Sequence, residues 1–99
     1  MEQSEIRGWV AGRVPQDWFE GAPEVLVDRD EIVVIGRLPD VAQQDGVDLA
    51  AARAGRVKQH REETREARMR IAQEAQRKFG RPVSWGARIA DEGQLFTHL

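Results

Sequence analysis

Basic side chains are concentrated in residues 53 to 81, which hold ten of the fifteen Lys and Arg residues against four acidic ones. Residues 1 to 52 hold four basic and eleven acidic side chains, so the two parts carry opposite net charge. Guanidinium and ammonium groups gathered on one exposed surface bind phosphate backbones by releasing counterions. The division is compatible with a nucleic-acid face, with self-association, with a basic helix lying on the acidic part, or with a solvated helix.

The candidate nucleic-acid contacts are five basic residues of this segment: Arg65, Arg70, Arg77, Lys78 and Arg81. Helical spacing does not place them all together, because Arg65 lies on the side of Lys58 whereas Arg70 and Arg77 lie on another side. Glu66 and Glu74 precede Arg70 and Lys78 by four residues, a spacing that by itself stabilises a helix. A structural role for these charges therefore remains an alternative to a binding role.

Two further arginines, Arg61 and Arg68, border the apolar side of the same segment. An arginine in that position either lays its aliphatic part along apolar surface so that its guanidinium group reaches water, or pairs with a carboxylate. We interpret them as tethering residues that pair with acids of the first half of the chain. The functional alternative is an anion pocket that they form together with Arg81.

Covalent catalysis finds little support in the composition. The chain has no Cys and no Tyr, and its serines are limited to Ser4 and Ser84, with no histidine near either one in any motif. Nucleophilic catalysis requires an activated nucleophile beside a base. No glycine-rich phosphate loop is present either. We therefore predict a non-enzymatic protein without a catalytic residue and without a cofactor.

Metal ligands are also sparse. His60 and His98 are the only histidines, and a metal site needs three or four converging ligands. The acidic turn of Asp28, Asp30 and Glu31 lacks the alternation and the glycine of a calcium loop. We interpret that turn as a solvated hairpin tip and predict no metal site.

Aromatic residues could serve as stacking platforms for bases. Trp85 precedes a glycine on a predicted strand, and Trp18 follows a turn. Burial is the stronger expectation, because a domain of 99 residues needs its large apolar side chains for a core. We expect Trp9, Trp18, Phe19 and Phe79 to share one core.

A long amphipathic helix from about Arg56 to Phe79 must position the basic residues. Apolar residues recur there at helical spacing, and Gly80 followed by Pro82 predicts the stop. Residues 39 to 55 show little periodicity, and we expect a mobile connection whose residues 48 to 54 are either nascent helix or an extension of the long helix.

The other elements are short. Residues 4 to 14 are predicted to form a helix with Ser4 as a candidate N-cap, although the alternation of apolar and polar residues also permits a strand. The segment PQDWFEG is predicted to form a second short helix. Residues 23 to 38 predict a hairpin whose second strand, Ile32 to Arg37, is apolar on both faces and should be central and covered. Residues 81 to 89 and 93 to 99 predict another hairpin with a turn at 90 to 93.

The predicted fold class is α+β, with a mostly antiparallel sheet of about four strands packed against one long helix and a short N-terminal helix. We expect a single domain over residues 1 to 99, and the sheet face without helices suggests a homo-oligomer. No run of 18 apolar residues and no signal pattern is present, so we expect a cytoplasmic protein without membrane contact. The apolar end of the sequence suggests a fragment of a longer chain.

Three stretches, WVAGRVPQDWF at 9 to 19, VDRDEIVVIGRL at 27 to 38 and REETREARMRIAQEAQRKFGRPVSWG at 61 to 86, resemble an uncharacterised family of small actinobacterial proteins. The resemblance covers most of the chain except residues 39 to 55. It implies that members continue beyond the position of Leu99 into a helical segment similar to ribbon-helix-helix DNA-binding units. It implies no activity and assigns no functional residue. The order of elements is also similar to that of KH-like modules, but the GxxG loop of those modules is missing.

Overall fold

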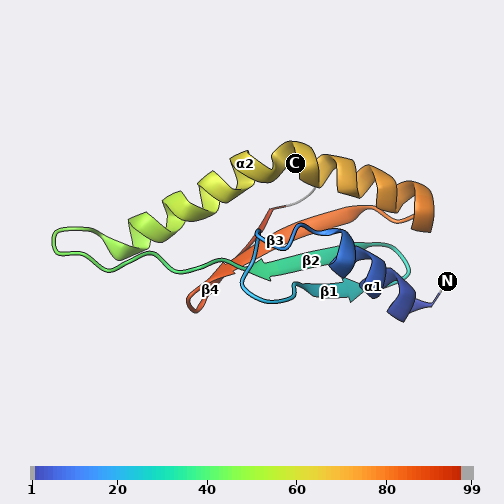
Figure 1. Ribbon diagram of the computed structural model, residues 1–99, viewed down its shortest axis with the longest axis horizontal. Helices are drawn as coiled ribbons and strands as arrows, with labels where there is room; N and C mark the ends of the chain where they lie inside the picture. Colours follow the sequence, from blue (N-terminus) through green and yellow to red (C-terminus); the bar gives the residue numbers. More distant parts are fainter. Residues whose placement is uncertain (1, 97–99) are drawn as a thin grey trace.

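The computed structural model describes the backbone of residues 2–96 and the side chains of residues 2–93. Its elements follow the order α1 (Gln3–Arg13), β1 (Glu24–Val27), β2 (Ile32–Arg37), α2 (Leu49–Phe79), β3 (Val83–Ile89) and β4 (Glu92–Phe96). Both helices cover one face of a four-stranded sheet (Figure 1). The predicted α+β class is thus confirmed.

The sheet is mixed, with strand order β1-β2-β3-β4. The two hairpin pairings, β1 with β2 and β3 with β4, are antiparallel as predicted. The central pairing of β2 with β3 is parallel, from Ile32 opposite Val83 to Arg37 opposite Arg88. Parallel neighbours require a crossover connection, and here α2 supplies it. The long helix therefore joins two strands as a β-α-β unit.

The helix α2 begins earlier than predicted because Asp48 caps it. The Asp48 carboxylate accepts a hydrogen bond from the Ala51 backbone N–H at 3.2 Å, which satisfies a donor that the first turn leaves open. The other end follows the prediction: Gly80 adopts a left-handed conformation with φ of 71°, and its N–H donates to the Gln76 carbonyl at 2.8 Å. Residues 49–55 of the predicted connection are helical.

The core lies between the sheet and the helices. Alternate residues of β2 and β3, including Ile32, Val34, Val83 and Trp85, are fully buried on this face. Ile6 and Val10 of α1 and Ile71 and Ala75 of α2 cover them. The expected aromatic core is present: Phe19 is buried, and Trp9, Trp18 and Phe79 pack against the cluster. Trp85 is only 1% exposed, so the suggestion that a base stacks on it is wrong.

Two details of the N-terminal region differ from the predictions. The helix α1 starts after Glu2, so Ser4 lies inside the helix and is not its cap. The segment predicted as a second short helix forms a single turn, in which the Trp18 N–H donates to the Pro15 carbonyl at 3.2 Å. Helix nucleation fixes several residues for one hydrogen bond, and tertiary contacts of Trp18 and Phe19 hold this segment in an irregular path instead.

The sheet face away from the helices is open. The strand β2 is central, as predicted, but only one of its faces is covered by helices. Leu26 is 49% exposed, and Val33 and Ile35 beside it are half-buried. The part of the predicted last strand beyond Phe96 lies outside the described residues.

The molecule is elongated because α2 is longer than the sheet. Its extents are 51 × 22 × 21 Å, and a helix of 31 residues is about 46 Å long. A seven-residue strand such as β3 spans only about 23 Å. The first two turns of α2 therefore extend beyond the sheet together with residues 39–48 (Figure 1), and the buried positions of the helix start only at Val57.

Candidate functional site

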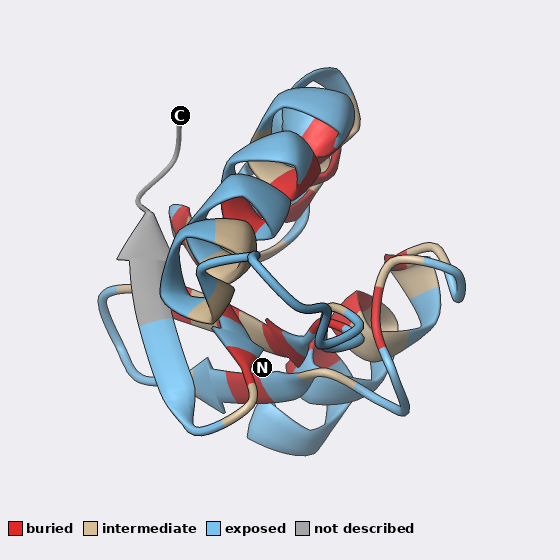
Figure 2. Cartoon of the chain, turned by 90° about the vertical axis from the view of Figure 1, so that its left-hand side faces the viewer, coloured by how far each residue is buried: buried red, intermediate tan, exposed pale blue. Residues whose placement is uncertain are grey.

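The outward surface of α2 carries most of the basic residues predicted as contacts. Buried positions form a stripe on the side of the helix that faces the sheet, and the other sides are exposed (Figure 2). Arg65, Arg70, Arg77 and Lys78 are all exposed. Within the described part of the chain, none of these four forms an ion pair with a carboxylate. Their charges are therefore directed to solvent.

The structure does not bring the five predicted contacts onto one patch. Arg65 lines a shallow groove of about 290 Å³ with Lys58, Arg61 and Arg68. Arg70 and Arg77 lie on the opposite flank, near Glu74, whose pKa is lowered mainly by its hydrogen bond from Arg13 and further by the charges of Arg77 and Arg70. The basic surface thus consists of two flanks on either side of the buried stripe.

Lys78 and Arg81 lie at the end of α2, where each has a local partner. The Lys78 Nζ lies 5.9 Å from the centre of the Phe79 ring, within the range of a cation–π contact. Arg81 is half-buried and turns toward the hairpin tip, where its Nε donates to the Arg29 carbonyl at 3.4 Å. Of the five candidates, Arg81 is therefore the least available to an external partner.

The acidic hairpin tip is organised by its own backbone. The Asp28 carboxylate accepts hydrogen bonds from the backbone N–H groups of Asp30 and Glu31 at 2.7 and 2.8 Å. These bonds lower the pKa of Asp28, and the positive charge of Arg81 adds to the effect. In the described residues, no three His, Asp or Glu side chains gather in a geometry that would hold a metal ion.

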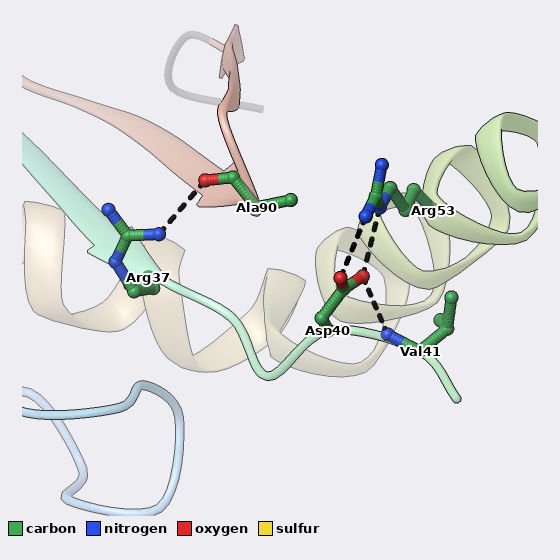
Figure 3. A network of polar contacts seen from close by, with 5 residues as sticks. All are labelled: Arg37, Asp40, Val41, Arg53 and Ala90. Carbon is green, nitrogen blue, oxygen red and sulfur yellow. Dashed lines mark hydrogen bonds and ion pairs between the residues drawn. The ribbon is translucent and has the colours of Figure 1, made fainter. Parts of the chain in front are cut away.

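Ion pairs connect the basic helix to α1 and to the connection before α2. Arg13 of α1 forms a bidentate contact with Glu74, from Nε to Oε1 at 2.7 Å and from Nη2 to Oε2 at 3.1 Å. Arg53 forms another with Asp40 at 2.9 and 2.8 Å, which fixes the start of the connection against α2 (Figure 3). The Arg53 guanidinium lowers the pKa of Asp40 to about 2.

The arginine Arg68 is buried rather than exposed, with 1% of its surface accessible. Its Nε donates to the Thr64 hydroxyl at 2.9 Å and its Nη2 donates to the Arg61 carbonyl at 2.7 Å. Burial lowers the pKa of Arg68, and the charges of Arg61 and Arg65 contribute in the same direction. Both of these hydrogen bonds connect Arg68 to other residues of α2.

A second concave region lies where α2 leaves the sheet. It is a cleft of about 560 Å³ between α2, the end of β2 and the turn that follows α1. Its apolar wall comprises Trp18, Leu38 and Pro39, and α2 contributes the buried side chains of His60 and Thr64. This cleft is not apparent in the sequence, because its walls come from three separate segments of the chain.

Polar side chains surround the mouth of this cleft. Asp17 comes from the turn, and Arg56, Gln59 and Glu63 come from successive turns of α2. Gln59 Nε2 donates to Glu63 Oε1 at 2.9 Å, which orients the carboxylate. The spacing of these α2 residues with His60 and Thr64 was the only signal in the sequence, since it places them on one helix face.

Known proteins provide a family for this chain. The family model described as Rv1265-like protein, N-terminal domain, matches residues 4–95. The uncharacterized proteins Rv1265 of Mycobacterium tuberculosis H37Rv and Mb1296 of Mycobacterium bovis are each 53% identical over 91 residues. The match covers 92% of this chain and 40% of each relative. No solved structure matches.

These findings confirm the resemblance to an uncharacterised actinobacterial family. The chain spans less than half the length of the curated relatives that it matches. Among the described residues, no helix is both long enough and apolar enough to cross a membrane. The chain belongs to the Rv1265-like N-terminal domain family.

Proposed function

We propose that this domain binds nucleic acid, or takes part in regulating it, without catalysing a reaction, and that the outward surface of α2 makes the contacts. The observation that supports the proposal is the outward direction of the charges. Arg65, Arg70, Arg77 and Lys78 are exposed, and none of these four forms an ion pair with a carboxylate in the part of the chain that the structure describes. Exposed cations without carboxylate partners are available for phosphates.

The geometry favours contact along the length of the helix over contact at a single point. Arg65 lies on one flank, and Arg70 and Arg77 lie on the other. A rod with cations on both flanks fits between two phosphate strands, as a helix does in a major groove about 12 Å wide. The expected binding is driven by phosphate contacts and depends little on base sequence.

Fluorescence anisotropy titrations test the proposal directly. Labelled duplex DNA, single-stranded DNA and RNA are titrated with the protein at two salt concentrations. We expect binding that weakens steeply with salt, because each phosphate contact contributes about 0.9 to the slope of log K against log salt for duplex DNA.

A matched pair of double variants makes the test specific. Arg70→Gln with Arg77→Gln removes two charges from the proposed surface, and Arg7→Gln with Arg29→Gln removes two exposed charges elsewhere. We expect only the first variant to bind more weakly and with a smaller salt slope. Equal effects of both variants, or binding no tighter than that of a neutral control protein at low salt, would contradict the proposal.

Self-association is a second candidate, and the open sheet face favours it. Leu26 of β1 is 49% exposed beside Val33 and Ile35 of β2, and the ion pair of Glu24 with Arg88 at 3.4 Å lies at the border of this face. Apolar side chains grouped on one exposed face are typical of protein interfaces. This candidate and nucleic-acid binding use different surfaces, so both can be correct.

A further inference from the structure

The cleft beside Trp18 has the chemical character of a site for a positively charged group. Sites for small ligands are typically concave and lined by apolar and aromatic side chains with a few convergent polar groups. The cleft of about 560 Å³ has this composition, with Trp18 in its wall and carboxylates at its mouth. It is also the largest of the concave regions described above.

The position of the cleft in the fold supports a binding role independently of its lining. Leu38 and Pro39 follow the carboxyl end of β2, where the chain leaves the parallel pair of strands for the crossover to α2. In open sheets with parallel strands, ligands bind outside the carboxyl ends of the strands. The cleft therefore opens where this architecture places ligand sites.

Trp18 provides the aromatic surface. Its ring meets those of Phe19, His60 and Trp85 at centroid distances of 6.2, 6.0 and 6.0 Å, and all three contacts are edge-to-face. None of these three rings is stacked parallel on the indole. An indole face attracts a cation more strongly than any other side-chain ring.

The charges around the mouth favour a cation over an anion. Two carboxylates, Asp17 and Glu63, face one guanidinium, Arg56. Arg56 also lies near Asp40, since its charge contributes to the lowered pKa of that carboxyl group. The mouth is therefore acidic although it belongs largely to the basic helix, and it would repel the phosphates that the outer surface is proposed to attract.

The imidazole of His60 carries no positive charge near neutral pH, so it does not repel a cation from the cleft. Burial in the cleft wall lowers the pKa of His60 to about 4, so the ring is neutral at pH 7. A protonated ring at this position would repel a bound cation. Near neutral pH, the ring of His60 is therefore uncharged, and the buried guanidinium of Arg68, whose charge also lowers the pKa of His60, donates to the Thr64 hydroxyl and the Arg61 carbonyl.

We propose that this cleft binds a guanidinium or ammonium group, which lies against Trp18 and donates hydrogen bonds to Asp17 and Glu63. Glu63 is preoriented by its hydrogen bond from Gln59, so the ordering cost on binding is reduced. The group could be carried by a free amine or by an arginine or lysine side chain of a protein. The proposal does not depend on nucleic-acid binding, because it concerns a different surface.

Tryptophan indole N–H signals in ¹⁵N–¹H NMR spectra provide the test. The protein is titrated with agmatine as the free guanidinium and with a blocked Gly-Arg-Gly peptide as the protein source. A citrulline analogue of the peptide is the neutral control, and AMP is the anionic one. We expect saturable shifts of the Trp18 signal with the guanidinium ligands only. If the peptide binds more tightly than agmatine, the cleft takes its cationic group from a protein side chain. If agmatine binds more tightly than the peptide, the cleft takes a free amine.

Two matched variants establish which charges are responsible. Asp17→Asn with Glu63→Gln removes the proposed acceptors, and Glu20→Gln with Glu66→Gln removes the same charge from exposed positions that do not line the cleft. We expect about a tenfold or greater loss of affinity in the first variant, in keeping with the loss of charged hydrogen bonds, and none in the second. Equal affinities of both variants, no saturable shift, or shifts with citrulline or AMP of the same size would overturn the proposal.

Discussion

At the scale of single residues, the structure shows that two side chains with the same charge can differ completely in exposure. Arg68 has the same side chain as Arg65, three residues earlier, yet Arg68 is buried against Thr64 whereas Arg65 is exposed. Composition alone counts both as potential phosphate contacts. The position of each residue relative to the buried stripe of α2 decides which one can reach a partner.

His60 gives a prediction about pH at this scale. Burial lowers its pKa to about 4, the charge of Arg68 adds to the effect, and Glu63 opposes it. The unfolded chain titrates this group near 6.5, so below that pH the unfolded state binds more protons than the folded state. The contribution of neutral His60 to stability is therefore complete above about pH 6.5 and is lost progressively as the pH falls toward 4.

The measurement is the free energy of unfolding by denaturant between about pH 7 and pH 4.5, for the natural sequence and for His60→Gln. We expect the natural sequence to lose stability more steeply than the variant over this range. The other histidine, His98, is present in both proteins and contributes equally. Parallel pH profiles would show that the imidazole of His60 is not shielded in the folded state.

At the scale of elements, Gly36 shows how a turn and a strand depend on each other. Gly36 lies near the end of β2, and a Cβ atom at this position would collide with the ring of Phe19. The turn that carries Phe19 can therefore lie against the sheet only because β2 has no side chain there. The same close approach supports Trp18, which forms the wall of the cleft.

Gly36→Ala is expected to destabilise the protein by about 1–3 kcal/mol, because the Phe19 ring must move out of a packed core. Gly8→Ala is the control: apart from the adjacent residues and the backbone of α1 itself, no atom lies within 4 Å of a Cβ at that position. It should stabilise the protein by about 1 kcal/mol, since Ala favours a helix interior over Gly. Thermal or denaturant unfolding distinguishes the two results, and a neutral Gly36→Ala variant would show that the Phe19 ring does not rest on the strand.

At the scale of the whole molecule, the length of α2 and the open sheet face determine which surfaces are available. The helix extends beyond the sheet, and Ala50, Ala51 and Gly55 of its first turns are exposed. The Asp40–Arg53 pair holds the connection against this part of the helix (Figure 3). The opposite face of the sheet presents Leu26, Val33 and Ile35. One protein thus offers a charged surface and an apolar surface on opposite sides.

Light scattering across ionic strength separates two forms of self-association. We expect any oligomer that uses the open sheet face to persist at high salt and to dissociate in Leu26→Lys, because this substitution places a charge in an apolar contact. An oligomer in which α2 of one copy meets the acidic hairpin of another should instead dissociate as salt increases. A protein that is monomeric at every salt concentration would exclude both forms.

The sequence by itself determined the elements, because periodicity and stop signals are local. It placed the end of α2 at Gly80 and Pro82, the two hairpins, and the central position of β2. It also placed the long helix on a single sheet, since one side of that helix is apolar. Asp48 was not identified as a helix cap because residues 39 to 55 show little periodicity, although its bond to Ala51 is local. The single turn after Pro15 was not distinguished from a short helix because the tertiary contacts of Trp18 and Phe19 outweigh a weak local preference.

Only the tertiary structure decided how these elements combine. The parallel pairing of β2 with β3 follows from the crossover of α2, and strand direction is not encoded in the alternation of side chains. The same crossover brings Trp18, Pro39 and Glu63, which are far apart in the sequence, to one cleft. The burial of Arg68 and the exposure of Arg70 were likewise set by how α2 lies on the sheet, since residue type fixes a charge and only packing fixes what surrounds it.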